Sequence, residues 1–594
     1  MLFSVGFVVF GIRMTKNFSP TFTVSNGTFS QSITPFETEN GTLCVFLPSY
    51  AQMRNITVNC NFGKKLFIND TLIADGTDCS DFKTGTPYSF RLGRNDETEI
   101  VFYMSSSIAT LDIRTESGTM EYLDSNKNHE EVVYITLYNT DGTVDCTDSY
   151  AHLKGRGNST WNLDKKPYTL TLSTDKPLLG MNSCSTWILL ANAADETNLN
   201  NKIVYDFAKK LDFEWSPDCR YADVYLNGEY NGLYLISEKA EIDESRLNLQ
   251  NGDFLCKNEL DSRFDFLNNP FITDSGRTVE VNFPDGFTEL DTANAQHLIN
   301  ELEQKIFSGT DLSVNTFFDL DSWACKYLVD EIFANIDSDI ASSYFYFCDG
   351  TFKGGPIWDY DMVLGHNNRN RFPTALIAMQ KAKSVSLKSP YYDALYRNKS
   401  FYSRMTELYA AEALPLLEGI ISDGISELYR QTESASRMNS IRWSQMFEEL
   451  YSSSTFPRSA EYITEYLRKR TDFLSDIWIN KAQYHTLQLQ PTKGAAYTFL
   501  SVKHGDTVDM TEYFPECGEW TIDDTGETAD FSKPITSDMC LTAVPVEKPA
   551  AKKESASTNN TKFALIIVAV MFIFFTVVAA INIIHYNKRR KADD

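Results

Sequence analysis

Residues 563–584 contain no charged side chain and read FALIIVAVMFIFFTVVAAINII. A helix of this length crosses the hydrocarbon layer of a bilayer, which is about 30 Å thick. A basic cluster follows from Lys588 to Lys591, and basic residues beside a spanning helix normally stay on the cytosolic side. The sequence therefore predicts one transmembrane helix over 563–584, a cytoplasmic basic tail over 585–594, and a large N-terminal part outside the cytosol.

The opposite end of the chain carries a short apolar run from Leu2 to Ile12. This run resembles the hydrophobic region of a secretory signal, although no basic residue precedes it. We predict a signal sequence over residues 1–15 with its cleavage site left open, and a buried strand is the alternative interpretation. Export of this kind agrees with the predicted topology, which places the ectodomain outside the cell or in the lumen of the secretory pathway.

Glycosylation motifs give an independent indication of the same topology. Asn-x-Ser/Thr occurs at Asn17, Asn26, Asn40, Asn55, Asn69, Asn158, Asn398 and Asn559. Five of these motifs precede residue 70, so their clustering indicates a sugar-covered outer segment. The chain is therefore predicted to be a single-pass type I membrane glycoprotein at the cell surface.

Charge and cysteine content restrict the classes of partner. The chain carries 54 basic and 80 acidic side chains, which gives a formal net charge of −26. Such a charge repels phosphate backbones, so it argues against a nucleic acid partner and favours divalent cations or basic proteins. The 11 cysteines include no Cys-x-x-Cys pair, so neither a zinc ribbon nor a thioredoxin-type site has support.

The two ends of the predicted ectodomain have an all-β pattern. Residues 16–110 alternate short apolar runs with Gly, Asn and Asp turns, and we interpret them as a β-sandwich accessory domain. Residues 481–547 again read as short strands and form a small β-rich segment. Residues 548–562 are too poor in apolar side chains to fold, and we interpret them as a polar stalk leading to the membrane.

Between these ends, residues 111–480 change from a strand pattern to a helix pattern. Residues 222–236 read ADVYLNGEYNGLYLI, two alternating runs around a turn that contains Gly, which predicts a β-hairpin. From 290 to 335, and again after 400, apolar residues recur every three or four positions, which predicts helices. A β-rich lobe followed by a mostly helical lobe is the order of kinase-like folds. The predicted fold class is therefore α+β, with a two-lobe kinase-like core.

The most informative segment is residues 343–365, SYFYFCDGTFKGGPIWDYDMVLG. Two predicted short strands flank an Asp-Gly turn, and Asp359 and Asp361 follow them. Carboxylates two residues apart on an extended stretch can approach one hard cation, and Mg²⁺ prefers oxygen ligands. A solvated surface turn is the alternative, but Asp359 and Asp361 have apolar neighbours, and an apolar setting disfavours charged groups without a partner. We therefore predict that Asp359 and Asp361 bind a metal ion.

A third carboxylate, Asp337, precedes Asp359 by 22 residues, with the predicted hairpin between them. This is an arrangement for phosphoryl transfer, because in protein kinases one Asp orients the acceptor hydroxyl and a second Asp, after a hairpin, holds the metal on the nucleotide phosphates. Asp339 is the rival for the first role. The alternative for either residue is that it only ends the preceding helix.

In the β-rich half, residues 154–172 read KGRGNSTWNLDKKPYTLTL. Gly155 and Gly157 would let backbone N–H groups approach phosphate oxygens. Neutralising charge for an ATP phosphate would come from Arg156, Lys165 or Lys166. An ordinary hairpin with solvated lysines is the alternative interpretation.

Two further residues bear on this predicted phosphate loop. Glu238 follows the second strand of the hairpin at 222–236, and it could pair with one of the lysines as the lobe Lys–Glu pair does in kinases. Asn158 lies within a glycosylation motif. A glycan there would obstruct the loop, so we expect Asn158 to be unmodified.

Several strings, in order over roughly residues 112–480, resemble those of the spore-coat CotH kinase family. They are GRGNSTW with KKPY, LLGMNSCSTWILLANAADETNLNNK, VYLNGEYNGLYLISEK, NIDSD and GGPIWDYDMVLG. The resemblance implies an atypical protein kinase that phosphorylates secreted proteins with ATP and a divalent metal, Mg²⁺ or Mn²⁺. It also implies roles for individual residues. Asp337 would be the catalytic-loop Asp, Asp359 the metal Asp and Asp361 a second candidate ligand, while Lys165 or Lys166 would face phosphate.

The chain departs from the pattern of ordinary protein kinases. The HRD, DFG and full GxGxxG signatures are absent, and Ser342 and Ser343 stand where an Asn for a second metal is expected. Two hypotheses therefore follow. The first is a membrane-anchored CotH-like kinase that phosphorylates Ser or Thr in secreted or surface proteins. The second is a catalytically inactive CotH-like surface adhesin or invasin that binds a receptor.

Overall fold

The structure is a computed structural model, and it describes ten stretches of the chain. These are residues 21–25, 30–53, 56–59, 65–73, 82–92, 96–211, 213–284, 288–378, 390–451 and 459–544. The predicted signal sequence at 1–15, the stalk at 548–562, the transmembrane span at 563–584 and the tail at 585–594 lie outside these residues.

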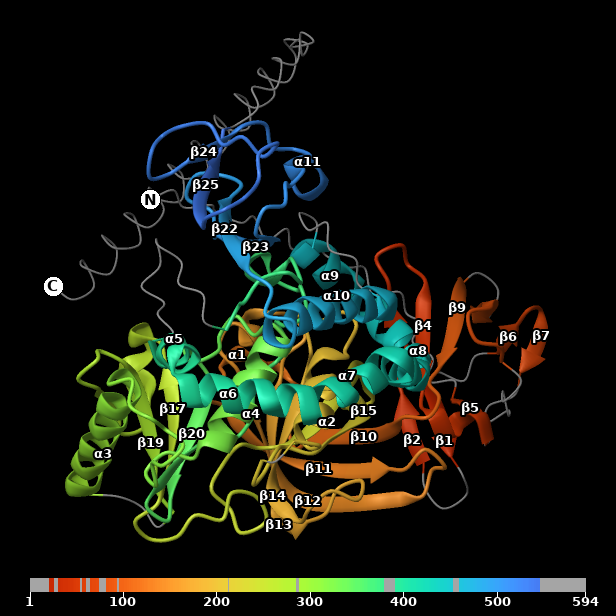
Figure 1. The fold of residues 1–594 in the computed structure, drawn as a ribbon. Helices are drawn as coiled ribbons and strands as arrows, with labels where there is room; N and C mark the ends of the chain where they lie inside the picture. The colour runs from red at the N-terminus through yellow and green to blue at the C-terminus, as the bar shows by residue number, and fades with distance from the viewer. Residues whose placement is uncertain are drawn as a thin grey trace, which may run out of the picture.

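Two sheets at the N-terminal end share one apolar core (Figure 1, red). One sheet has three strands in the order β2-β1-β5, and the other has six in the order β3-β4-β9-β8-β6-β7. The strands are β1 (Thr21–Ser25), β2 (Ser30–Ile33), β3 (Phe36–Glu37), β4 (Leu43–Leu47), β5 (Ile56–Asn59), β6 (Leu66–Ile68), β7 (Thr71–Ile73), β8 (Pro87–Leu92) and β9 (Asp96–Met104). Phe22 of β1 packs edge-on against Phe102 of β9 with 5.3 Å between ring centroids, so aromatic contacts join the sheets.

A closed barrel of seven strands follows, in the order β10-β11-β12-β13-β14-β16-β15. The strands are β10 (Ala109–Thr115), β11 (Glu130–Tyr138), β12 (Val144–Gly155), β13 (Tyr168–Lys176), β14 (Cys184–Leu190), β15 (Cys219–Leu226) and β16 (Glu229–Glu238). The predicted hairpin at 222–236 is confirmed as β15 and β16. Its turn residues Asn227 and Gly228 both have positive φ, at 52° and 86°, as a two-residue hairpin turn requires.

A five-stranded sheet, in the order β18-β19-β17-β20-β21, stands beside the barrel. Its strands are β17 (Phe254–Glu259), β18 (Pro270–Ile272), β19 (Thr278–Asn282), β20 (Ser343–Cys348) and β21 (Thr351–Gly354). The predicted turn at Asp349 and Gly350 is confirmed, because it joins the paired strands β20 and β21. This hairpin therefore lies between the two acidic segments identified in the sequence.

Helices pack against this sheet and the barrel, and one of them, α8, also contacts the N-terminal strand β9 (Figure 1). They are α1 (Glu121–Ser125), α2 (Asn200–Ala208), α3 (Glu289–Phe307), α4 (Leu320–Ile332), α5 (Pro390–Arg397), α6 (Lys399–Leu408), α7 (Leu414–Gly419), α8 (Ile425–Arg442), α9 (Ser444–Tyr451) and α10 (Ala460–Trp478). Helix α4 is buried at every position from Ser322 to Ile332. Its polar side chains must therefore find partners inside the protein.

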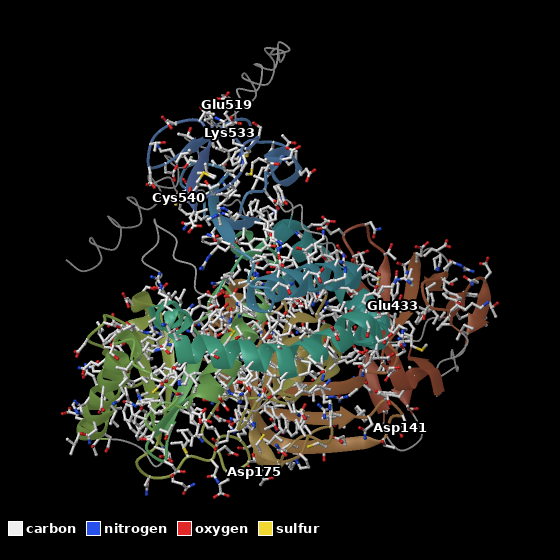
Figure 2. All side chains as sticks on the ribbon, viewed as in Figure 1. Asp141, Asp175, Glu433, Glu519, Lys533 and Cys540 are labelled. Atoms are coloured by element: carbon white, nitrogen blue, oxygen red, sulfur yellow. The ribbon has the colours of Figure 1, made fainter. Side chains whose placement is uncertain are left out.

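A small sheet with its own core ends the described chain (Figure 1, blue). It consists of β22 (Tyr484–Gln490), β23 (Thr498–Lys503), β24 (Trp520–Ile522) and β25 (Met539–Ala543), with α11 (Met510–Tyr513) alongside. Acidic side chains such as Asp141, Asp175, Glu433 and Glu519 lie exposed on different parts of the surface (Figure 2). These exposed carboxylates are therefore spread over the molecule and remain in water.

The predicted fold class needs correction. The structure is a mixed α/β fold built around a closed barrel and four further sheets. Within the residues that the structure describes, no helix is long and apolar enough to span a bilayer. The barrel was not predicted because its closure depends on parallel pairing of β10 with β15, which are about a hundred residues apart and carry no local signature of their pairing.

Four of the predicted glycosylation motifs fall within the described residues. Asn40, Asn69 and Asn158 are exposed. Asn398 is buried, and its Nδ2 donates a hydrogen bond to the Thr310 carbonyl at 2.7 Å. Since a glycan is attached through this nitrogen, the folded chain does not present Asn398 for modification.

Candidate active site

A cleft of about 600 Å³ opens where the barrel meets the five-stranded sheet. The loop after β12 forms one wall, β17 forms another, and the segments after α4 and β21 form the floor. Polar lining side chains include Lys127, Arg156, Asn158, Lys257, Glu259, Arg263, Asp337, Ser342, Asp359 and Asp361. Several segments far apart in the sequence therefore contribute to one cavity, which carries side chains of both charge signs.

Three carboxylates predicted from the sequence meet in this cleft. Burial and the charges of Asp359 and Asp337 raise the pKa of Asp361 to about 8. Burial and the charge of Asp359 raise the pKa of Asp337 to about 6. All three carboxylates line this one cleft, and a bound cation would relieve the repulsion between them. The oxygen-only donor set suits Mg²⁺ or Mn²⁺.

Helix α2 holds the segment that carries Asp359 and Asp361. The Asn200 side chain donates to the Asp361 carbonyl at 2.9 Å, and the Asn201 side chain accepts from the Tyr360 amide at 2.8 Å. Asp359 has a φ of +67°, which is unusual for a residue other than glycine. Asn200 and Asn201, from the string NLNNK at 198–202, therefore stabilise the unusual backbone of the segment that carries both carboxylates.

In the segment after α4, Asp337 and the alternative candidate Asp339 have different surroundings. Asp337 lines the cleft, and its amide donates to the Asn335 side chain at 3.0 Å. Asp339 is 2% exposed and forms a buried ion pair with Arg277 at 2.8 Å. Only Asp337 of the two is therefore placed to contact a ligand in this cleft.

Arg156 and Lys165, both predicted to bind phosphate, have different surroundings. Arg156 lines the cleft, and its guanidinium lies 5.4 Å from the centre of the Trp358 ring. Lys165 is fully buried, and its Nζ donates to the carbonyls of Ala191 and Leu233, both at 2.6 Å. Burial lowers the pKa of Lys165. The structure therefore does not place Lys165 at the cleft.

Lys166 and Glu238 also lie outside the cleft lining. The Lys166 Nζ donates to the carbonyls of Trp161 and Leu163, at 3.1 and 3.2 Å, and so closes the turn before β13. The Glu238 carboxylate is buried and accepts from the Asp218 amide at 2.9 Å. The predicted pairing of Glu238 with a lysine is therefore not formed.

Other cations that sequence reasoning missed do line the cleft. Lys127 donates to the Gly157 carbonyl at 3.0 Å, which ties it to the glycine-rich loop. Lys257 lies 3.6 Å from the carboxylate of Glu259, and Arg263 lies 2.8 Å from the same side chain. The position of Lys257 could have been noticed in the sequence, because this lysine interrupts the otherwise buried strand FLCKNE. The position of Lys127 could not, since it lies in a polar turn.

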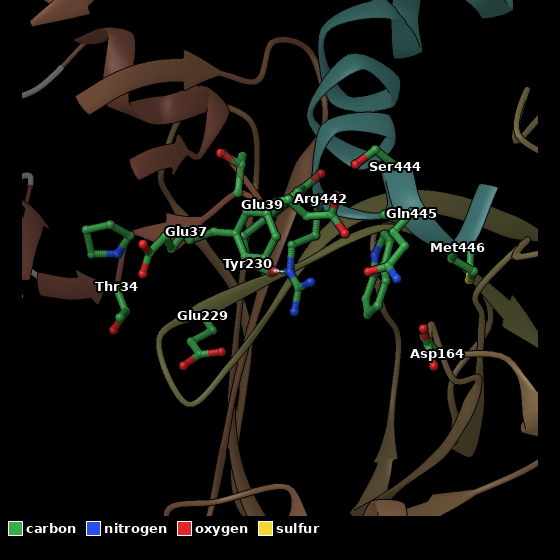
Figure 3. Close-up of a pocket in the computed structure, with 14 residues that line it drawn as sticks. Thr34, Glu37, Glu39, Asp164, Glu229, Tyr230, Arg442, Ser444, Gln445 and Met446 are labelled. Atoms are coloured by element: carbon green, nitrogen blue, oxygen red, sulfur yellow. Dashed lines mark hydrogen bonds between the residues drawn. The ribbon is translucent and has the colours of Figure 1, made fainter. Parts of the chain in front are cut away.

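A second cavity, of about 460 Å³, lies between the N-terminal sheet, the β15–β16 hairpin and α9 (Figure 3). Its acidic side chains Glu37, Glu39, Asp164 and Glu229 are exposed. The Arg442 guanidinium stacks above two aromatic rings there, at 4.5 and 4.3 Å from their centres. No residue predicted to be catalytic or metal-binding lines this cavity, so the converging carboxylates distinguish the first cleft.

A family model described as CotH kinase protein matches residues 153–474, which is 322 of the 594 residues. The matched stretch begins in β12, ends in α10, and contains Asp337, Asp359 and Asp361. No curated protein matches the chain.

Proposed function

The chain belongs to the CotH kinase family, and from that premise we propose that it transfers the γ-phosphoryl group of ATP to Ser or Thr hydroxyls of secreted or surface proteins. The proposal includes a divalent cation, Mg²⁺ or Mn²⁺. The observation that carries it is the convergence of Asp337 with Asp359 and Asp361 in one cleft. Their order, with the β20–β21 hairpin between them, is the order of a kinase site.

Four charged groups of the cleft have roles in this proposal. Asp359 and Asp361 hold the cation, which supplies neutralising charge to the phosphates when bound. Arg156, from the loop above the cleft, contacts a phosphate. Asp337 accepts a hydrogen bond from the acceptor hydroxyl and takes its proton as the new P–O bond forms and the bond to ADP breaks. Its raised pKa suits a general base near neutral pH.

Cation-dependent nucleotide binding separates this proposal from the adhesin hypothesis. We expect ATP with Mn²⁺ to raise the melting temperature of the protein, because a ligand at 100 times its Kd adds about 2.7 kcal/mol to the stability of the native state. A fluorimetric melt measures the shift, with ATP alone and Mn²⁺ alone as controls. An unchanged melting temperature with saturating ATP and Mn²⁺ would favour a binding protein without a nucleotide site.

The affinity for the cation should depend on pH. Below its pKa a carboxyl is protonated and cannot bind a metal, so the cation competes with a proton for Asp361. The Asp361 pKa of about 8 predicts an Mn²⁺ affinity that rises steadily from pH 6 to pH 8. Calorimetric titration in buffers of different ionisation enthalpy measures both the affinity and the proton release. A constant affinity with no proton release would contradict this carboxylate cluster.

A further inference from the structure

Asp330, in the last turn of α4, connects the two acidic segments without lining the cleft. It is fully buried. Its Oδ1 accepts a hydrogen bond from the Tyr360 hydroxyl at 2.6 Å and another from the Asn335 side chain at 2.8 Å. Tyr360 stands between Asp359 and Asp361 in the chain. One oxygen atom therefore contacts both segments that carry the proposed site.

The contact through Asn335 reaches the backbone of the other acidic residue. The Asn335 amide donates to the Asp330 carbonyl at 2.8 Å, and the Asn335 side chain accepts from the Asp337 amide at 3.0 Å. Asn335 is 8% exposed. Two hydrogen bonds in series therefore join the carboxylate of Asp330 to the backbone of Asp337.

The other oxygen of the same carboxylate has different partners. Its Oδ2 accepts from the Tyr392 hydroxyl of α5 at 2.6 Å and from the Lys326 Nζ at 3.2 Å. Tyr392 is fully buried, like Tyr360. The two tyrosines thus make equivalent hydrogen bonds to one carboxylate, but only Tyr360 belongs to the candidate site.

We propose that Asp330 is a positioning residue, which fixes the spacing between Asp337 and the Asp359–Asp361 pair. The proposal rests on the proposed kinase function, since that spacing matters when a cation and an acceptor hydroxyl must occupy the cleft together. Hydrogen bonds to a carboxylate are short and strongly directional. A displacement of about 1 Å in a reacting group lowers rates by up to about a hundredfold, so a fixed separation contributes directly to turnover.

Tyr360→Phe tests the proposal, with Tyr392→Phe as the matched control. Each substitution removes one hydroxyl from Asp330 and keeps the ring that fills the core. For Tyr360→Phe we expect kcat to fall about tenfold or more, and the Kd for Mn²⁺ to rise by a similar factor, with a small change in melting temperature. Tyr392→Phe should lower the melting temperature as much and leave both constants near their wild-type values.

Amide hydrogen exchange supplies a readout that needs no activity. In Tyr360→Phe, exchange should increase in the segment 334–341 as well as in 358–365, because the hydrogen bonds through Asp330 link them. Tyr392→Phe should leave exchange in both segments unchanged. Equal effects of the two substitutions, or faster exchange in 358–365 alone, would overturn the positioning role. A wild-type protein that transfers no phosphate would contradict the proposed function, whereas the exchange data would still decide the link.

Discussion

Asp359→Asn should lower kcat for phosphoryl transfer by about a thousandfold or more. The substitution removes one negative charge from the cation site, and a bound cation supplies several kcal/mol of transition-state stabilisation. The fold should be unaffected, because the Asp359 side chain is exposed to the cleft and Asn tolerates its φ of +67°. Transfer of ³²P from [γ-³²P]ATP to dephosphorylated casein, a secreted phosphoprotein, with Mn²⁺ present, measures the effect.

Asp349→Asn provides a control of the same chemistry. Asp349 is also exposed and has a φ of +50°, but it lies at the far turn of the β20–β21 hairpin and does not line the cleft. It should retain wild-type activity. Equal transfer by wild type and Asp359→Asn would contradict the assignment of the cation site.

Glu331→Ala should lower the free energy of unfolding by about 3–5 kcal/mol, because it leaves a buried positive charge without its partner. Glu331 and Arg470 are both 0% exposed, with 2.5 Å between carboxylate and guanidinium. The same carboxylate accepts from the backbone amides of Ile377 and Ala378. The pair thus joins α4, α10 and the segment before α5. Chemical denaturation followed by tryptophan fluorescence measures the loss, as a lower midpoint of the transition that includes α4.

Arg468→Ala and a double substitution complete the experiment. Arg468 lies on α10, like Arg470, and pairs with Glu465 at the surface. Its removal should therefore lower the free energy of unfolding by less than about 1 kcal/mol. Replacing Glu331 and Arg470 together with methionine should recover part of the stability, since no buried charge then remains. A cost for Glu331→Ala no greater than that for Arg468→Ala would show that the buried pair does not hold these elements together.

Elements of the fold that depend on neighbouring residues, such as a hairpin, could be predicted from the sequence. The hairpin at 222–236 was predictable because its turn pair, Asn227 and Gly228, favours the left-handed backbone that such a turn needs. The barrel was not, because alternation identifies strands but not their partners. Pairing of β10 with β15 joins residues such as Thr110 and Asp223, and nothing near either residue identifies the other.

The candidate site likewise has residues whose positions could be predicted from the sequence and residues whose positions could not. The positions of Asp337 and Asp359 could be predicted because a short hairpin alone separates them, so their approach depends on local structure. Lys165 and Lys166 could not be told apart, since both lie in the turn before β13 and no strand or helix periodicity assigns either side chain to a face. A buried lysine is also rare. Only tertiary packing determines that Lys165 is buried against the carbonyls of Ala191 and Leu233.

Closure of the barrel also restricts how another polypeptide can join this protein by strand addition. Each of the seven barrel strands pairs with a neighbour on both sides within the described residues, although β12 pairs with β13 only over His152–Gly155, and a strand that is paired on both sides has no row of unused backbone donors and acceptors. An incoming extended segment requires such a row. In the five-stranded sheet the outermost strands are β18 and β21, but the outer edge of β21 is already occupied, because the Phe352 amide donates to the Phe317 carbonyl and the Phe352 carbonyl accepts from the Asp319 amide, both at 2.9 Å.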